Sequence, residues 1–215
     1  MNTIQEIYSL LLERFGPQGW WPCPEYHSED YSFPKTKEEQ LEIILGTILT
    51  QNTSWKNVEK ALKNLKEKTE LNKEKIKQLP EKELALLIRS SGYHNQKAKK
   101  IKEYLKNEPS TRKELLSTWG IGPETADSIL LYAYKQPVFI IDTYTKRILS
   151  RLGFKENSYE KLQYLFEHQL PKDYTIYNEY HALLVKLAKE NCKTKPECSS
   201  CPLKEKCKFY KSLIQ

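Results

Sequence analysis

Apolar residues recur at intervals of three and four along almost the whole chain, the spacing of one face of an α-helix. The pattern opens with Ile4, Ile7 and Leu11. The run Val138–Ile141 resembles a strand but is too short to build a sheet. The pattern therefore predicts an all-α protein. After the first helix, the predicted helices cover Glu38–Thr50, Trp55–Leu65, Leu84–Ile88, Gln96–Leu105, Thr111–Thr118, Pro123–Tyr134, Asp142–Leu152, Tyr159–Gln169 and Asn178–Asn191.

Two stretches lie outside this pattern. Gly16–Pro34 is rich in proline and aromatic residues and predicts a loop whose rings must pack on something. The second stretch follows the last predicted helix and carries four cysteines in the pattern C-x5-C-x2-C-x5-C: Cys192, Cys198, Cys201 and Cys207. This loop is rich in lysine and has no apolar run, so we expect a metal to supply the order that a core cannot.

Three kinds of site compete for these cysteines. Four thiolates, one for each iron, are what a [4Fe–4S] cluster needs, and we place this interpretation first. Zinc comes second, because structural zinc sites usually pair two C-x2-C knuckles and only one is present. Disulfides come last, because Met1–Leu12 includes Glu6 and does not resemble a signal peptide for an oxidising compartment. Cys23 lies far from the others in sequence and is interpreted as a packed thiol.

Composition narrows the class of protein. The 215 residues are 39% hydrophobic and 29% charged, and no apolar run approaches the roughly 20 residues of a membrane helix. We therefore expect a cytoplasmic protein with no membrane partner. The net charge is +7, and lysine is concentrated in Tyr93–Lys106, with five lysines against one glutamate, and in Lys189–Gln215, with seven against three. Such basic segments favour a polyanion as partner, most often nucleic acid.

One turn between helices has the composition of a phosphate-binding site. The segment Leu116–Ala126 reads L-S-T-W-G-I-G-P-E-T-A, with Gly120 and Gly122 around one apolar residue and Pro123 at the start of the next helix. Backbone amides at such a turn attract anions, although a plain helix–helix turn has the same composition. Asp142 follows an apolar helix and precedes another, where it could cap that helix or do chemistry.

The order of hairpin, aspartate and cysteine loop resembles the helix-hairpin-helix DNA glycosylase superfamily, and the cysteine loop resembles that of its endonuclease III branch. The segments Leu49–Thr53, L-T-Q-N-T, and Ser91–Ala98, S-G-Y-H-N-Q-K-A, are similar to the family's sequence in the same places. The resemblance implies DNA contacts by Gly120, Gly122, Gln51 and Lys97, with Gln51 filling the gap left by a flipped base. It also implies that Asp142 is catalytic, stabilising positive charge on the sugar and orienting or deprotonating water.

The chain departs from endonuclease III at one position. Bifunctional members have a lysine two residues after the second hairpin glycine, and its amine forms a Schiff base with the sugar. Glu124 stands at that position here. A carboxylate cannot form an imine, so the resemblance implies a monofunctional glycosylase that uses water. Lys146 and Lys97 are nearby amines that could take the place of this lysine, but the simpler interpretation is that both are solvated.

The tryptophans point to one subfamily. Trp20 and Trp21 in the early loop, Trp55 after L-T-Q-N-T, and Glu124 together resemble the 3-methyladenine DNA glycosylase III subfamily, whose bacterial type lacks the cluster cysteines. The resemblance implies that these residues surround an alkylated base, since indole faces attract a cationic purine. Trp119, beside the hairpin, is interpreted as packing beneath it. No partner can be assigned from the sequence to His168 or His181.

These observations predict two helical lobes with a DNA-binding cleft between them: a six-helix barrel over residues 34–137, and an iron–sulfur lobe over 1–33 and 138–215. The expected protein is a monomer acting on double-stranded DNA that contains a damaged base. The leading function is a monofunctional DNA N-glycosylase of base excision repair, removing an alkylated purine such as 3-methyladenine. The alternatives are an endonuclease III-like glycosylase for oxidised pyrimidines or mismatches, and a non-catalytic DNA-binding module.

Overall fold

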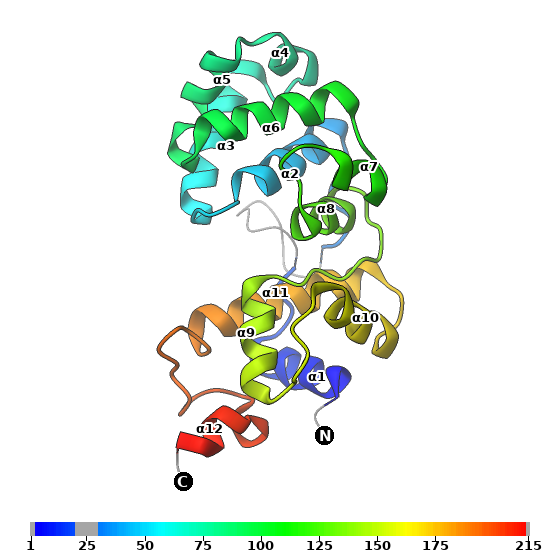
Figure 1. Ribbon diagram of the computed structural model, residues 1–215, viewed down its shortest axis with the longest axis vertical. Helices are drawn as coiled ribbons and strands as arrows, with labels where there is room; N and C mark the ends of the chain where they lie inside the picture. Colours follow the sequence, from blue (N-terminus) through cyan, green and yellow to red (C-terminus); the bar gives the residue numbers. More distant parts are fainter. Residues whose placement is uncertain (1–2, 20–29, 214–215) are drawn as a thin grey trace. The chain divides into compact units, whose positions relative to one another are not determined.

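The computed structural model describes residues 3–19 and 30–213, and this part of the chain contains helices and no strands (Figure 1). The prediction of an all-α protein is confirmed. The helices are α1 (Ile4–Phe15), α2 (Lys37–Leu49), α3 (Trp55–Thr69), α4 (Lys73–Gln78), α5 (Glu81–Leu87), η1 (Arg89–Ser91), α6 (His94–Asn107), α7 (Arg112–Ser117), α8 (Pro123–Ser128), η2 (Ile129–Ala133), α9 (Thr143–Leu152), α10 (Tyr159–Gln169), α11 (Tyr174–Glu190), η3 (Lys204–Lys206) and α12 (Lys208–Leu213).

The chain forms two compact units. The central unit comprises residues 32–136, and the terminal unit comprises residues 1–31 and 137–215. The terminal unit therefore contains both ends of the chain (Figure 1). The sequence predicts a lobe over residues 34–137, bounds that differ from those of the central unit by two residues at the start and one at the end.

The central unit is built around α2. This helix begins with a capping box, in which the Thr36 hydroxyl accepts a hydrogen bond from the backbone N–H of Glu39 and the Glu39 carboxylate accepts one from the backbone N–H of Thr36. Its apolar residues are buried on nearly every side, including Ile43, Leu45 and Ile48. Helices α3, α6 and η2 pack against it. A helix that is apolar all round must be surrounded in this way.

The hairpin of the central unit is held at both ends. Its first helix, α7, starts with a capping box formed by Thr111 and Glu114. Its second helix, α8, continues as the π-helix η2, all of whose residues are buried. The buried carboxylate of Asp127 on α8 accepts two hydrogen bonds from Arg112 on α7, at 2.7 and 3.1 Å. This bidentate pair fixes the two helices against each other.

The core of the terminal unit is aromatic. The rings of Phe139 and Phe166 stack with their centroids 4.0 Å apart, and Tyr180 meets both. The Tyr180 hydroxyl donates to the carbonyl of Ile4, which fastens α1 onto α11. The run Val138–Ile141, which resembles a strand in sequence, has no partner strand among the described residues, and its last three residues are buried. Side chains of α10 satisfy its backbone instead: Glu167 accepts from the N–H of Phe139 and Gln163 donates to its carbonyl.

A buried carboxylate ties together separate parts of the terminal unit. Glu179 on α11 accepts hydrogen bonds from the backbone N–H of Gln18 at 2.7 Å, from that of Gly19 at 3.2 Å, and from the Tyr31 hydroxyl. Three donors satisfy a charge that would otherwise be costly to bury. Gly19 and Tyr31, on the two sides of the segment 20–29, are thus held close to α11. Across residues 3–19 and 30–213, no helix is long and apolar enough to cross a membrane.

Candidate functional site

The hairpin turn places one glycine where only glycine fits easily. The N–H of Ile121 donates to the carbonyl of Thr118 at 3.1 Å, which makes Trp119 and Gly120 the central residues of a tight turn. Gly120 has φ +82°, and a Cβ there would lie 2.5 Å from the side chain of Lys100. Gly122 has φ −93° and ψ 179°, extended backbone that any residue adopts. Gly122 therefore caps α8 without the constraint that Gly120 carries.

Gln51 holds this turn in place. Its side-chain nitrogen donates to the carbonyl of Gly120 at 3.2 Å and to the hydroxyl of Thr125 at 2.9 Å, and its oxygen accepts from the ammonium of Lys100. All the hydrogen-bonding groups of the amide are thus engaged within the central unit. Gln51 therefore lies against the hairpin turn, and its contact with DNA stays a prediction.

Lys97 does not reach the surface, which corrects the prediction that it contacts DNA. It is 2% exposed, and its ammonium donates to the carbonyls of Leu49 at 2.9 Å and Ser91 at 2.6 Å. Burial lowers the pKa of Lys97 to about 8, and the neighbouring charge of Lys100 adds to this effect. Lys97 is a buried cap for the end of α2, two residues before Gln51, and it cannot meet a phosphate from this position.

Much of the basic segment Tyr93–Lys106 is engaged within the fold in the same way. Lys102 donates to three carbonyls at the end of α4, those of Ile76, Lys77 and Leu79. Together with Lys97 and Lys100, this leaves Lys99 and Lys106 as the exposed lysines of the segment. The lysine count in the sequence thus overstates the positive charge that this helix presents to a polyanion.

The tryptophans and Glu124 differ in how exposed they are. Trp20 and Trp21 lie outside the described residues. Trp55 is partly buried at the first position of α3, four residues after Gln51. Trp119 is 49% exposed, with the Lys99 ammonium 4.6 Å from its ring centroid, so the prediction that it packs under the hairpin is wrong. Glu124 is exposed in the first turn of α8, where a carboxylate is favourable.

Asp142 is the N-cap of α9 in the terminal unit. Its Oδ1 accepts from the backbone N–H of Thr145 at 2.7 Å, and its Oδ2 lies 3.6 Å from Nε2 of His181 on α11. Only 9% of the residue is exposed. Burial by itself raises the pKa of this carboxyl, but His181 and the Thr145 N–H together outweigh burial and bring the pKa below its usual 3.8. Asp142 is thus a buried carboxylate that stays ionised, with one oxygen in the cap and the other beside an imidazole.

The sequence did not reveal His181 as the neighbour of Asp142. The two residues lie on different helices, and no local motif links positions so far apart. Only the packing of α9 on α11 brings them together. His168, the other histidine for which the sequence gives no partner, stacks on the ring of Tyr164 with centroids 5.2 Å apart.

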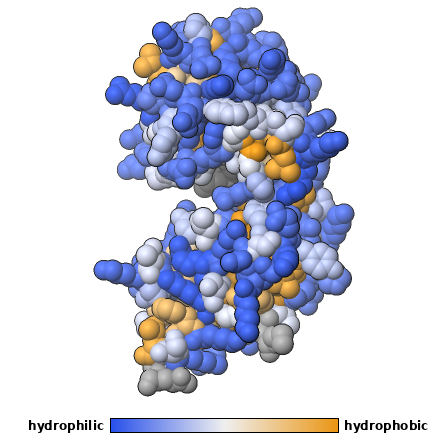
Figure 2. Space-filling view, in the orientation of Figure 1, coloured by the Kyte–Doolittle hydropathy of each residue, from blue (hydrophilic) through white to orange (hydrophobic). Residues whose placement is uncertain are grey.

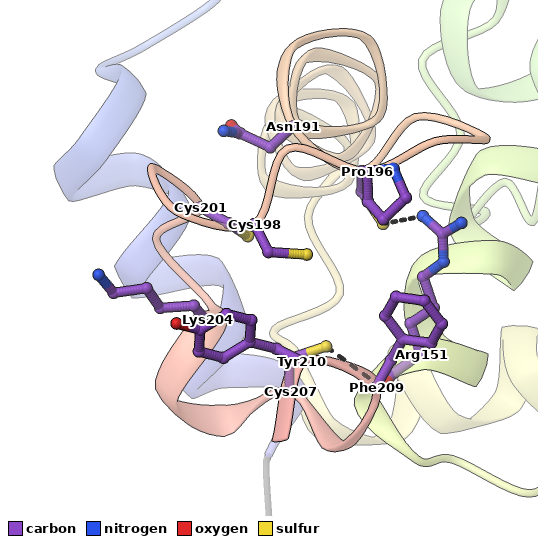
Figure 3. A pocket seen from close by; sticks show the side chains of 10 residues that line it. Arg151, Asn191, Pro196, Cys198, Cys201, Lys204, Cys207, Phe209 and Tyr210 are labelled. Carbon is purple, nitrogen blue, oxygen red and sulfur yellow. Dashed lines mark hydrogen bonds between the residues drawn. The ribbon is translucent and has the colours of Figure 1, made fainter. Parts of the chain in front are cut away.

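The four cysteines of the terminal loop line one pocket together with Arg151 and Asn191 (Figure 3). All four are free thiols. Figure 3 shows the side chains of Cys198 and Cys207 directed toward the same space, with Arg151 at its edge. Among the described residues, no three His, Cys, Asp or Glu side chains are close enough together to hold one metal ion as they stand. The fit of a cluster therefore rests on the shared pocket and the four-thiol donor set.

Arginines of α9 hold this loop. Arg151 donates to the sulfur of Cys192 at 3.2 Å and to the carbonyl of Lys193 at 2.6 Å, and Arg147 donates to the carbonyl of Cys192 at 2.9 Å. Burial raises the pKa of Cys201 to about 11 and also raises that of Cys198, and the nearby thiols add to both shifts. Four thiols that line one pocket can be thiolates together only if a cation compensates their charge.

Comparison with known proteins agrees with this geometry. Residues 45–172 match the HhH-GPD superfamily base excision DNA repair protein family. A candidate DNA repair glycosylase of Methanocaldococcus jannaschii is 44% identical over 96% of this chain and 96% of its own length. The structure of a trapped endonuclease III–DNA covalent intermediate matches with a TM-score of 0.80 and 25% identity over 100% of both chains. That of H. pylori 3-methyladenine DNA glycosylase bound to 1,N6-ethenoadenine matches with a TM-score of 0.71 and 28% identity, over 88% of this chain and 98% of that one. The predicted resemblance is confirmed, and the chain belongs to the helix-hairpin-helix (HhH-GPD) superfamily of base excision DNA repair glycosylases.

Proposed function

We propose that this chain is a monofunctional DNA N-glycosylase that hydrolyses the bond between sugar and base at a flipped, alkylated purine such as 3-methyladenine. The observation that carries the proposal is Asp142: a nearly buried carboxylate, held ionised at the start of α9 beside His181. A buried charge of this kind is costly to keep, and a helix cap alone would be served as well by serine or asparagine. Negative charge at this point suits a reaction that develops positive charge on a sugar.

In the proposed reaction, Asp142 stabilises the cationic sugar as the base departs and orients the water that replaces it. The Thr145 N–H occupies Oδ1, so Oδ2 is the oxygen available for this work. His181 stands 3.6 Å from Oδ2 and helps to hold the carboxylate in its charged form. The lesion leaves the base stack before these groups can reach the sugar.

The absence of a Schiff-base amine supports the monofunctional assignment. Glu124 occupies the position at which the bifunctional enzymes have their lysine. Lys97, one possible substitute amine, is buried and donates hydrogen bonds to two backbone carbonyls. Lys146, the other, has its ammonium 5.9 Å from the ring centroid of Tyr159. Without an imine, the product is an intact abasic strand and not a cleaved one.

Two features favour an alkylated purine as the substrate. The H. pylori relative is named for 3-methyladenine and is bound to a modified adenine. This chain has Trp20, Trp21 and Trp55 at positions that resemble that subfamily's aromatic residues, and an indole attracts a cationic purine. We assign the base pocket to these tryptophans and Glu124.

The four cysteines are proposed to hold a [4Fe–4S] cluster. Cys192, Cys198, Cys201 and Cys207 supply one thiolate for each iron, and they line one pocket. When bound, the cluster supplies positive charge and covalent order to a loop that has few apolar residues of its own. The Arg151 contacts with this loop shape the pocket from the side of α9.

DNA contact is assigned to the turn of Gly120 and Gly122 and to Gln51. Gln51 would have to give up its hydrogen bonds to Gly120 and Thr125 to enter a DNA duplex. The expected partner is double-stranded DNA containing a damaged base, and the expected state is a monomer in the cytoplasm.

The test is a panel of DNA duplexes that each carry one lesion. We expect release of 3-methyladenine by the wild-type protein, strand breaks only after alkali, and no covalent adduct on treatment with borohydride. Release of thymine glycol but not of 3-methyladenine would move the assignment to the endonuclease III-like alternative, which the full-length structural match favours. An efficient borohydride adduct would contradict the monofunctional assignment. Release of no base from any duplex would leave the non-catalytic DNA-binding module.

A further inference from the structure

Trp119 is the one aromatic side chain at the hairpin turn, and it faces outward. The residues on either side of the Trp119–Gly120 turn point inward: Thr118 is 6% exposed and Ile121 is 5% exposed, whereas Trp119 is 49% exposed. The Thr118 hydroxyl donates to the carbonyl of Glu114, and the turn is closed by the Ile121 N–H. The same rigid turn that buries its neighbours therefore presents the indole to solvent.

A cation lies over this indole. The ammonium of Lys99 on α6 is 4.6 Å from the Trp119 ring centroid, and the side chain of Lys100 packs against Gly120. The carboxylate of α7, that of Glu114, accepts from the N–H groups of Ser110 and Thr111 and is engaged in the cap. The indole thus carries the positive charge of one α6 lysine, Lys99, over its ring.

The surrounding surface is mostly hydrophilic. Figure 2 shows a small apolar patch over the region of α7 and α8, on a face of the central unit that is largely hydrophilic. Leu116, at the end of α7, is 38% exposed. A half-exposed indole with a lysine over its ring combines an apolar surface with positive charge, which are complementary to the sugar and the phosphate of a nucleic-acid backbone.

We propose that Trp119 and Lys99 form a contact for the DNA backbone, in which the indole packs against deoxyribose and the Lys99 ammonium binds the adjoining phosphate. This contact deepens the proposed function, because it adds a surface beside the hairpin amides to hold the duplex. It reads no base, so it acts on damaged and undamaged DNA alike. Neither residue touches the reacting bond.

The two members of the contact should give different signatures in binding to an undamaged duplex. Trp119→Ala should weaken binding about fivefold or more at every salt concentration, as expected for loss of one aromatic anchor. The slope of log affinity against log salt should not change. Lys99→Gln should reduce that slope by about 0.9, the loss of one phosphate contact. Leu86→Ala is the matched control, since Leu86 is 66% exposed on α5 of the same unit.

A second variant and a second measurement distinguish loss of the DNA contact from misfolding of the variant. Trp119→Phe retains an aromatic ring and should bind nearly as wild type. The difference in fluorescence between wild type and Trp119→Phe reports the Trp119 indole, and DNA should protect it from quenching by iodide. Wild-type affinity in Trp119→Ala, or no protection of the indole by DNA, would overturn the proposal. Undamaged duplex requires no base release, so this outcome is distinguishable from failure of the glycosylase assignment, which the lesion panel tests.

Discussion

At the scale of single residues, Asp142 combines a structural and a proposed chemical role that can be separated by substitution. Asparagine caps a helix about as well as aspartate, so Asp142→Asn should keep α9 intact while removing the charge. Base release should fall by at least about a hundredfold, and affinity for lesion DNA should stay the same or rise, because a negative charge near phosphates is lost. Single-turnover base release and equilibrium binding measure the two effects.

Asp173→Asn is the control for this substitution. Asp173 caps α11 in the same way, accepting from the Thr175 N–H at 2.7 Å. Equal base release in Asp142→Asn and Asp173→Asn would remove Asp142 from the mechanism. Because the folded protein lowers the pKa of Asp142, its carboxylate stays ionised as pH falls below 3.8. Loss of Asp142 charge should therefore contribute no acid limb to the rate between pH 5 and pH 8.

The buried ammonium of Lys97 predicts an unusual dependence of stability on pH. Its pKa is about 8 in the folded protein and ordinarily 10.5, so between these values the unfolded chain binds more protons. The penalty for burying the charge is complete below pH 8 and is relieved as pH rises toward 10.5. The free energy of unfolding of wild type should rise over this window relative to that of Lys97→Met, by up to about 3 kcal/mol.

Denaturant unfolding of both proteins at several pH values measures this difference. Other groups that titrate in the window are common to both chains, so the difference curve isolates Lys97. Lys99→Met, which removes an exposed lysine two residues along α6, should follow the wild-type curve. A flat difference between wild type and Lys97→Met would contradict the assignment of a buried, charged amine.

At this scale, the sequence predicts what a side chain can do chemically better than it predicts what surrounds that side chain. Gln51, Gly120, Asp142 and the cysteines stand in motifs, and their residue types limit what they can do. Whether Lys97 or Trp119 faces water depends on distant backbone carbonyls and on the conformation of one turn, which no local pattern encodes. The proximity of His181 to Asp142 is likewise a product of packing between helices.

At the scale of elements, the hairpin depends on the pair of Arg112 and Asp127. Arg112→Ala would leave the Asp127 carboxylate buried without its bidentate partner. We expect the free energy of unfolding to fall by about 3 kcal/mol, the low end for a broken buried pair, because the Arg112 side chain is 37% exposed. Affinity for undamaged DNA should fall as well, since the two helices that present the turn would no longer be fixed.

Denaturant unfolding and DNA titration measure these effects. Lys113→Ala is the control, because Lys113 is the exposed neighbour on the same helix. If Arg112→Ala and Lys113→Ala unfold at the same denaturant concentration, the pair contributes nothing to the hairpin.

Helix positions follow from periodicity where the amphipathic pattern is long. The predicted helix Tyr159–Gln169 has the same bounds as α10, and the two hairpin helices begin within a residue of their predicted starts. The short helices α4 and α12 escape prediction, because six lysine-rich residues show no complete apolar face. The last long helix begins at Tyr174, earlier than predicted, because the Asp173 cap is not an apolar signal.

At the scale of the whole molecule, the cysteine loop is expected to depend on its metal. The loop is fastened to the rest of the terminal unit by Arg151 on α9 and by an ion pair between Lys206 and Glu6 on α1. Helix α12 packs on α9 as well. Apolar burial in the loop itself is small, with Leu203 its one buried apolar side chain. Binding of a metal by the thiolates then adds directly to the free energy of folding.

Protein purified without oxygen should therefore contain about four irons per chain. Cys198→Ser should lower the iron content and the melting temperature together, because a serine hydroxyl is a poor ligand for iron. Cys23→Ser, at the one cysteine outside the loop, should change neither. Stoichiometric zinc in protein made with ample iron would replace the cluster assignment with a zinc site. Full stability of Cys198→Ser without metal would mean that the contacts of Arg151 and Lys206 suffice to order the loop.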